Sequence, residues 1–146
     1  MTSISELIPV LQIAIGPVIL ISGIGLLLLS MTNRLSRVIE RARMLLGGLS
    51  EKTPARVRRR VMAQIDILWG QARLIRSAIL LAATSVLCAA CLIIVLFLTA
   101  LFNIEDAWLI SILFVTCLLS LVGSLIAFIT DINRSLSAFK VELYEG

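Results

Sequence analysis

The sequence contains no histidine, and this absence removes the commonest metal ligand and general base from the chain. The three cysteines, Cys88, Cys91 and Cys117, all lie in apolar runs, which lack the electropositive surroundings that activate a thiol. The adjacent acids Glu105 and Asp106 are typical of a helix start, where the positive end of the helix favours acids. No nucleophile–base pair is recognisable. We therefore expect no catalytic site, no metal site, no cofactor and no enzymatic activity.

Charged residues are also missing from three long stretches of the chain. About 20 apolar residues are enough for a helix to cross a bilayer, and each stretch exceeds that length. We therefore expect one all-α membrane domain with three transmembrane helices. A cleavable signal peptide is not expected, because the N-terminus has no cation and the first apolar run is too long. The predicted spans are residues 7–31, 78–102 and 107–130.

Most of the positive charge lies between the first two spans. Residues 34–76 contain eleven of the thirteen Lys and Arg residues and three acids, which gives a net charge of +8. The loop at residues 103–106 contains two acids and no cation, and the N-terminal tail contains Glu6. Loops on the cytoplasmic side of a membrane collect Lys and Arg. The middle segment and the C-terminus are therefore predicted to be cytoplasmic, and the N-terminus is predicted to lie outside.

Apolar residues recur at helical spacing through residues 32–77, so the first two membrane helices are expected to continue beyond the bilayer. Gly47-Gly48 is a helix stop signal, and Thr53-Pro54 restarts a helix as an N-cap followed by proline at the first helical position. In the second arm the apolar spacing approaches the 3.5-residue repeat of coiled coils. These signals predict a cytoplasmic antiparallel helical hairpin over residues 32–77, with a shorter first arm.

Arginines form two clusters on this hairpin. Four lie at its base, where they can reach lipid phosphates, although basic flanks also serve orientation alone. Four others lie together at its tip, which orientation does not require, so we expect the tip to bind an acidic cytoplasmic protein or an anionic lipid surface. Nucleic acid is a weaker interpretation, because the cluster has no aromatic residues to stack on bases. The base cluster is Arg34, Arg37, Arg73 and Arg76, and the tip cluster is Arg56, Arg58, Arg59 and Arg60.

Small and polar residues form stripes on two of the spans. Such stripes let membrane helices approach closely. The stripe on the first span could instead line a water-filled pore, but it contains no ionisable group, which favours close packing. Three helices cannot easily cover both stripes and a half-apolar hairpin, so we predict a homo-oligomer with the first or third helix at subunit contacts. The stripes are Gln12, Gly16, Gly23 and Ser30 on the first span, and Thr116, Ser120, Gly123, Ser124 and Ala127 on the third.

Three segments have a familiar combined pattern: ISGIGLLLLSMTNRLSRVIERAR from Ile21, RRRVMAQIDILWGQARLIRSAIL from Arg58, and DINRSLSAFKVEL from Asp131. Together they resemble a family of small bacterial membrane proteins known as domain of unknown function 2721. The resemblance implies a three-span bacterial membrane protein, for which we expect the inner membrane, and it implies no activity and no site residue. The matching positions at the inner membrane face are expected to form a polar contact layer. They are Asn33, Arg34, Ser135 and Leu136.

These observations favour a non-enzymatic membrane scaffold or adaptor that forms a homo-oligomer and presents a basic cytoplasmic hairpin. Its expected partners are further copies of itself, anionic lipids and an acidic cytoplasmic protein. The alternative is a homo-oligomeric channel, with the stripe on the first span facing water. The C-terminal tail, residues 131–146, is amphipathic, and we expect it to continue as a helix and pack on the base of the hairpin.

Overall fold

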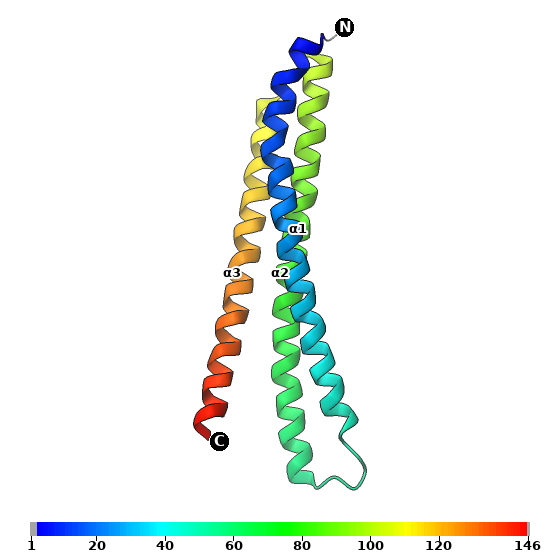
Figure 1. Cartoon of the computed structure of the whole chain (residues 1–146), viewed down its shortest axis with the longest axis vertical. Helices are drawn as coiled ribbons and strands as arrows, with labels where there is room; N and C mark the ends of the chain where they lie inside the picture. Colours follow the sequence, from blue (N-terminus) through cyan, green and yellow to red (C-terminus); the bar gives the residue numbers. More distant parts are fainter. Residues whose placement is uncertain (1–2, 146) are drawn as a thin grey trace.

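The computed structural model describes residues 3–145 as three long α-helices joined by two short connections, and it describes side chains for residues 3–137. The helices are α1 (Ile4–Gly47), α2 (Ala55–Phe102) and α3 (Ala107–Glu145). Helix α2 is antiparallel to α1 and α3 and contacts both of them, as Figure 1 shows. The predicted all-α class is therefore confirmed.

All three helices are long and apolar enough to cross a membrane. Within their most apolar windows only 11% of α1, 22% of α2 and 11% of α3 is buried inside the chain. Most of the large apolar side chains therefore face outward, which a water-soluble monomer rarely tolerates over such an area. The fold is that of a multi-pass membrane protein.

Helix α1 continues far beyond the first apolar run. Pro9 and Pro17 lie inside it without ending it, and proline is tolerated in membrane helices because neighbouring groups satisfy the freed backbone. The helix ends at Gly47, and the N–H of Gly48 donates to the Met44 carbonyl at 3.2 Å. The Gly-Gly stop signal is thus confirmed. At about 1.5 Å per residue, the 44 residues of α1 extend over about 66 Å, roughly twice the thickness of a bilayer core.

The predicted start of the second helix is wrong by one residue. Helix α2 begins at Ala55, and Pro54 is the residue before it. Thr53 does not cap the helix, because its Oγ1 accepts a hydrogen bond from the Ser50 N–H at 2.9 Å and closes the loop instead. The N–H of Arg58 then donates to the Pro54 carbonyl at 3.0 Å, as the first turn of α2 begins.

The connection from α2 to α3 turns sharply at Asn103. This residue has φ of 51°, in the left-handed region, which asparagine tolerates better than most residues. The N–H of Ile104 donates to the Thr99 carbonyl at 3.1 Å, so a free carbonyl at the helix end is satisfied. The reversal leaves α2 and α3 as antiparallel neighbours, as the short loop predicts.

Small side chains on α2 allow close contact with both neighbours. Ala78 and Ala82 are fully buried, and they pack against Ile24 and Met31 of α1. On the α3 side, the hydroxyl of buried Ser124 donates to the Ala78 carbonyl at 2.7 Å. Polar atoms between membrane helices are satisfied by such interhelical hydrogen bonds. The core is therefore centred on one face of α2.

A second hydrogen bond of the same kind lies nearer the connection between α2 and α3. The hydroxyl of Ser85, fully buried on α2, donates to the Cys117 carbonyl at 2.9 Å. The Cys117 thiol donates in turn to the Ser85 carbonyl at 3.3 Å. Cys117 thus acts as a buried packing residue with a weak donor.

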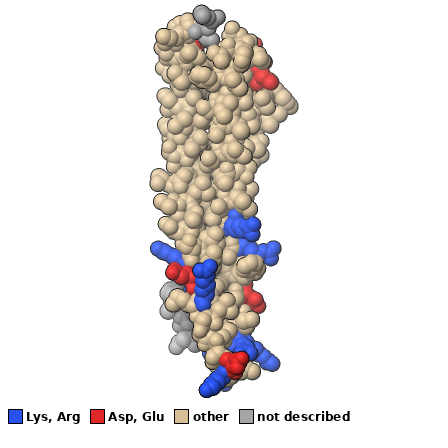
Figure 2. Space-filling view, turned by 90° about the vertical axis from the view of Figure 1, so that its right-hand side faces the viewer, with Lys and Arg blue, Asp and Glu red and all other residues tan. Residues whose placement is uncertain are grey.

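Charged side chains gather at the two ends of the molecule. Figure 2 shows a broad band without charge, with most of the Lys and Arg side chains on the part that carries the connection from α1 to α2. Among the described residues, the opposite end carries acids and no Lys or Arg, with Glu6 near the N-terminus and Glu105 and Asp106 between α2 and α3. The band without charge has the form expected of a membrane-embedded belt.

Candidate functional site

The part of α1 and α2 beyond the apolar runs is called the basic hairpin here, and it comprises residues 32–77. Its arms are unequal, since α1 ends at Gly47 whereas α2 begins at Ala55, so α2 supplies the longer arm. The connection is held by hydrogen bonds to Ser50: its hydroxyl is 3.2 Å from the Thr53 hydroxyl, and its carbonyl accepts from the Thr53 N–H at 3.0 Å and from Arg58 Nη2 at 3.1 Å. The hairpin thus ends in a braced loop followed directly by the arginines of α2.

The arginine tip is exposed on the first turns of α2. All four of its side chains are exposed, and Arg58 alone is engaged, through the Ser50 carbonyl. Among the side chains described, none of the four forms an ion pair. Four closely spaced cations with low-dielectric protein behind them attract anions and anionic surfaces. The tip is Arg56, Arg58, Arg59 and Arg60.

A polar junction links all three helices where the hairpin meets the apolar runs. Arg34 of α1 donates from Nε to the Asp131 carboxylate of α3, and from Nη2 to the Ser135 hydroxyl at 2.7 Å. Gln71 of α2 donates to the same hydroxyl at 3.3 Å. The Asp131 side chain is fully buried, whereas Arg34 is 30% exposed. This junction therefore fixes the start of the C-terminal tail against the base of the hairpin.

The polar contact layer expected from the resemblance is found in part. The hydrogen bond between Arg34 and Ser135 joins two of its four positions. Asn33 and Leu136 are exposed and take no part. Sequence reasoning missed Asp131 and Gln71. An acid immediately after an apolar run, on the side of the molecule rich in arginine, was the signal that could have indicated Asp131.

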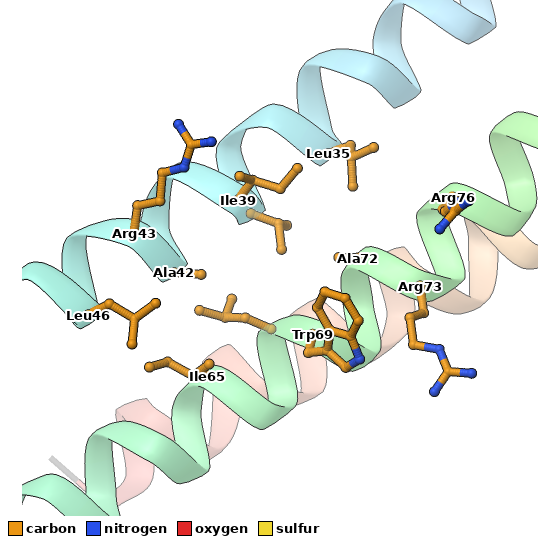
Figure 3. A pocket seen from close by; sticks show the side chains of 12 residues that line it. Leu35, Ile39, Ala42, Arg43, Leu46, Ile65, Trp69, Ala72, Arg73 and Arg76 are labelled. Carbon is orange, nitrogen blue, oxygen red and sulfur yellow. The ribbon is translucent and has the colours of Figure 1, made fainter.

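An apolar groove runs between the two arms of the hairpin. Its volume is about 470 Å³, which lies within the range of roughly 300–1,000 Å³ found for small-molecule sites. Figure 3 shows apolar side chains from α1 and α2 facing each other across it, with Trp69 at its side. Trp69 is 66% exposed although it lies outside the apolar runs. The groove is lined by Leu35, Val38, Ile39, Ala42, Arg43, Leu46, Ile65, Leu68, Trp69, Ala72, Arg73 and Arg76.

The base arginines predicted from the sequence separate into three environments. Arg34 belongs to the polar junction, Arg73 and Arg76 border the groove, and Arg37 is exposed away from both. The groove was not predicted as such, although the coiled-coil spacing of the second arm indicated an apolar face that needs a partner. The hairpin therefore presents guanidinium groups beside apolar surface, an arrangement suited to binding.

The two stripes of small residues differ in what they contact. On α3, Ser124 is bonded to α2, and a Cβ added at Gly123 would lie 3.4 Å from Leu81 Cδ1. Thr116 is exposed and bonds to its own helix, whereas Ser120 and Ala127 are half-buried. On α1, a Cβ added at either glycine of the stripe would meet nothing within 4 Å. The α1 stripe is exposed throughout and comprises Gln12, Gly16, Gly23 and Ser30.

Comparison with known proteins identifies a family. A family model described as "Protein of unknown function (DUF2721)" matches residues 14–141, which is most of the chain. No curated protein and no solved structure matches the chain. Among the described residues, no group of three or more His, Cys, Asp or Glu side chains could hold a metal ion.

Proposed function

The chain belongs to this family of proteins of unknown function, and we propose that it is a non-enzymatic membrane scaffold whose basic hairpin docks acidic surfaces. In this proposal the protein lies in the bacterial inner membrane, with its N-terminus outside and its hairpin and C-terminus in the cytoplasm. The orientation is supported by the separation of charge along the molecule, with the cations at the hairpin end and acids at the other (Figure 2). Lys and Arg accumulate on the cytoplasmic side of membrane proteins.

The observation that carries the proposal is the exposed arginine tip at the far end of the hairpin. From Ala55 to Ser77 the second arm has 23 residues, which at about 1.5 Å per residue places the tip about 35 Å beyond the apolar run. The Debye length is about 8 Å at physiological ionic strength, so the tip does not sense the phosphates of its own membrane. An acidic surface outside that membrane, such as an acidic cytoplasmic protein, is the ligand that this position favours.

The base of the hairpin has a different expected ligand. Arg37 and Arg76 lie within a few residues of the apolar runs and are exposed, so their guanidinium groups can reach lipid phosphates. Anionic lipids are therefore proposed as partners of the base, and acidic proteins as partners of the tip.

The proposal is tested with the full chain embedded in phosphatidylcholine nanodiscs and poly-glutamate as the acidic probe. Replacing the four tip arginines with Gln should remove most of the binding, and binding to the unchanged protein should weaken steeply with salt. The matched control loses the same number of positive charges outside the tip. In it, Gln replaces Arg37, Arg41, Arg43 and Arg134. Equal binding by the tip variant and the unchanged protein would refute the proposal.

The second candidate function is a homo-oligomeric channel, and the exposed α1 stripe favours it. A Cβ added at Gly16 or Gly23 would meet nothing within 4 Å in the monomer, so the stripe is available either to neighbouring copies or to a hydrated axis. A channel predicts single-channel currents in planar bilayers that change in Gly23→Leu. Both candidate functions include a homo-oligomer. A clean monomer by mass measurement in detergent would therefore exclude the channel, and the scaffold would then act as a monomer.

A further inference from the structure

We propose that the groove of the basic hairpin binds one acyl chain of an anionic phospholipid, with the lipid phosphate held by Arg73 and Arg76. This site is separate from the arginine tip and uses a different part of α2. It would let the protein hold a lipid partly outside the bilayer, with its headgroup at the membrane boundary and one chain between the arms of the hairpin.

The lining of the groove has the chemistry of an amphiphile site. Nine of its twelve lining residues are apolar, and the other three are arginines. No acid lines it. An apolar channel bordered only by cations is complementary to a molecule with a hydrocarbon chain and a phosphate, because arginine binds phosphate through a planar fork of donors.

The position of the groove supplies a route for such a molecule. Arg76 lies two residues before Ala78, where the apolar run of α2 begins, and Arg73 lies one turn further out. Leu35, at the same end of the groove, follows the polar junction directly on α1. The end of the groove that Arg73 and Arg76 border is therefore level with the headgroups of the surrounding membrane. A lipid can enter it without its phosphate leaving the interface.

The apolar surface exposed in the groove needs to be covered, and a second copy of the chain is not suited to cover it. Ile39, Leu46 and Trp69 are 42%, 50% and 66% exposed outside the apolar runs. In a second copy the same face carries the same arginines, so face-to-face pairing would bring like charges together. A volume of about 470 Å³ also lies in the range of roughly 300–1,000 Å³ for small-molecule sites. A lipid chain fits this volume and brings no further positive charge to the arginines.

Trp69 provides a direct test. It lies nine residues before Ala78 on α2, which places it about 13.5 Å along the helix from the apolar run, beyond the chains of an undisturbed bilayer. In Trp108→Phe the remaining tryptophan is Trp69, so its fluorescence reports the groove alone. The full-length variant is reconstituted in phosphatidylcholine containing a fixed fraction of lipid with brominated acyl chains, which quench tryptophan on contact.

Brominated phosphatidylglycerol should quench Trp69 strongly, and the same fraction of brominated phosphatidylcholine should quench it weakly. Replacing Arg73 or Arg76 with Gln should weaken the preference for phosphatidylglycerol about fivefold each, the effect of one cation near an anionic lipid. The matched control, Arg41→Gln with Arg134→Gln, removes two exposed arginines that do not line the groove and should leave the preference unchanged. Ala72→Phe fills the groove and should abolish quenching, and circular dichroism verifies that the helices remain.

Three results would overturn the proposal. They are no quenching by either lipid, equal quenching by both lipids, and quenching that persists in a folded Ala72→Phe variant. An acidic amphipathic peptide is the competing occupant. If a glutamate-rich amphipathic peptide shifts Trp69 emission while brominated lipid leaves it unchanged, the groove binds a helix and not a lipid. The tip variant should retain lipid quenching, so failure of the docking function and failure of this site are distinguishable.

Discussion

Arg34 on α1 and Asp131 on α3 form an ion pair that joins positions 97 residues apart in the sequence. The two charges are not equivalent, because the Asp131 side chain is fully buried and Arg34 is 30% exposed. Among the side chains that the structure describes, the Oδ1 atom of Asp131 has no hydrogen-bond partner, and Arg34 is the one cation that compensates this buried carboxylate. A buried carboxylate without a cation is far more costly than an arginine that can turn toward water.

Removing either partner of this pair should therefore give unequal losses of stability. Arg34→Gln leaves the buried carboxylate uncompensated and should destabilise the protein by about 3–5 kcal/mol, the cost of breaking a buried pair. Asp131→Asn keeps the shape and leaves Arg34 near water, so about 1–2 kcal/mol is expected. Urea unfolding in detergent, followed by circular dichroism, measures both. Equal losses would contradict the asymmetry, and the exposed Arg37→Gln is the control, with an expected change within about 0.5 kcal/mol.

The hydrogen bond from Ser124 to α2 should be detectable against a residue of the same stripe that lacks such a bond. Ser124→Ala removes a buried bond to the Ala78 carbonyl, and interhelical bonds in membranes contribute about 0.6 kcal/mol on average and about 1.7 at most. Thr116 bonds to Ile112 of its own helix and is exposed, so Thr116→Ala should have almost no effect. The same unfolding measurement compares them, and a larger loss in the Thr116 variant would contradict the assignment of the contact face.

Glycines of the two stripes should respond differently to leucine. At Gly123 a Cβ already lies 3.4 Å from Leu81, so Gly123→Leu overpacks the contact between α2 and α3 and should cost about 1–3 kcal/mol. At Gly23 a Cβ meets nothing, so Gly23→Leu should leave the fold of the monomer intact and weaken self-association. Unfolding and light-scattering mass in detergent separate the two effects. A Gly23→Leu variant that associates like the unchanged protein would exclude this stripe from subunit contacts.

The position at the end of α2 with left-handed backbone, Asn103, should tolerate substitution by glycine but not by a β-branched residue. Asn103 has φ of 51°, a conformation that costs about 1–2 kcal/mol for an ordinary L-residue. Asn103→Val should therefore destabilise the protein by about that amount, whereas Asn103→Gly should be neutral or slightly stabilising. Thermal unfolding in detergent measures both, and a neutral valine variant would show that the turn has relaxed to another conformation.

The helices and their long extensions could be predicted because they depend on local signals. Uncharged runs of about 20 residues predicted the spans, and Gly47-Gly48 predicted the end of α1. The predicted start of α2 is wrong by one residue, because the Thr53 hydroxyl accepts from the Ser50 N–H in the loop instead of capping the helix. Helix-end predictions are sensitive to such competition between side chains.

The contacts between helices were predictable only where they follow from chain connectivity. The antiparallel pairing of α2 with α3 follows from a four-residue loop, whereas the pairing of Arg34 with Asp131 needs the register of α1 against α3. The groove likewise depends on which faces of two helices meet, and apolar spacing alone does not distinguish a filled seam from an open one. The orientation in the membrane and the partners of the hairpin are proposals that rest on charge.

Helix α2 contacts both of its neighbours, and α1 and α3 contact each other far less. The main contacts are thus between helices that are consecutive along the chain. During synthesis, α1 and α2 can associate before α3 has emerged, and α3 can then add to a pair that is already formed. Asp131 is the last buried residue among the side chains described, residues 3–137, so the pairing of its carboxylate with Arg34 comes late in the assembly of the bundle. We therefore expect a chain truncated before Asp131 to assemble its first two helices and to leave Arg34 accessible for quality control by the cell.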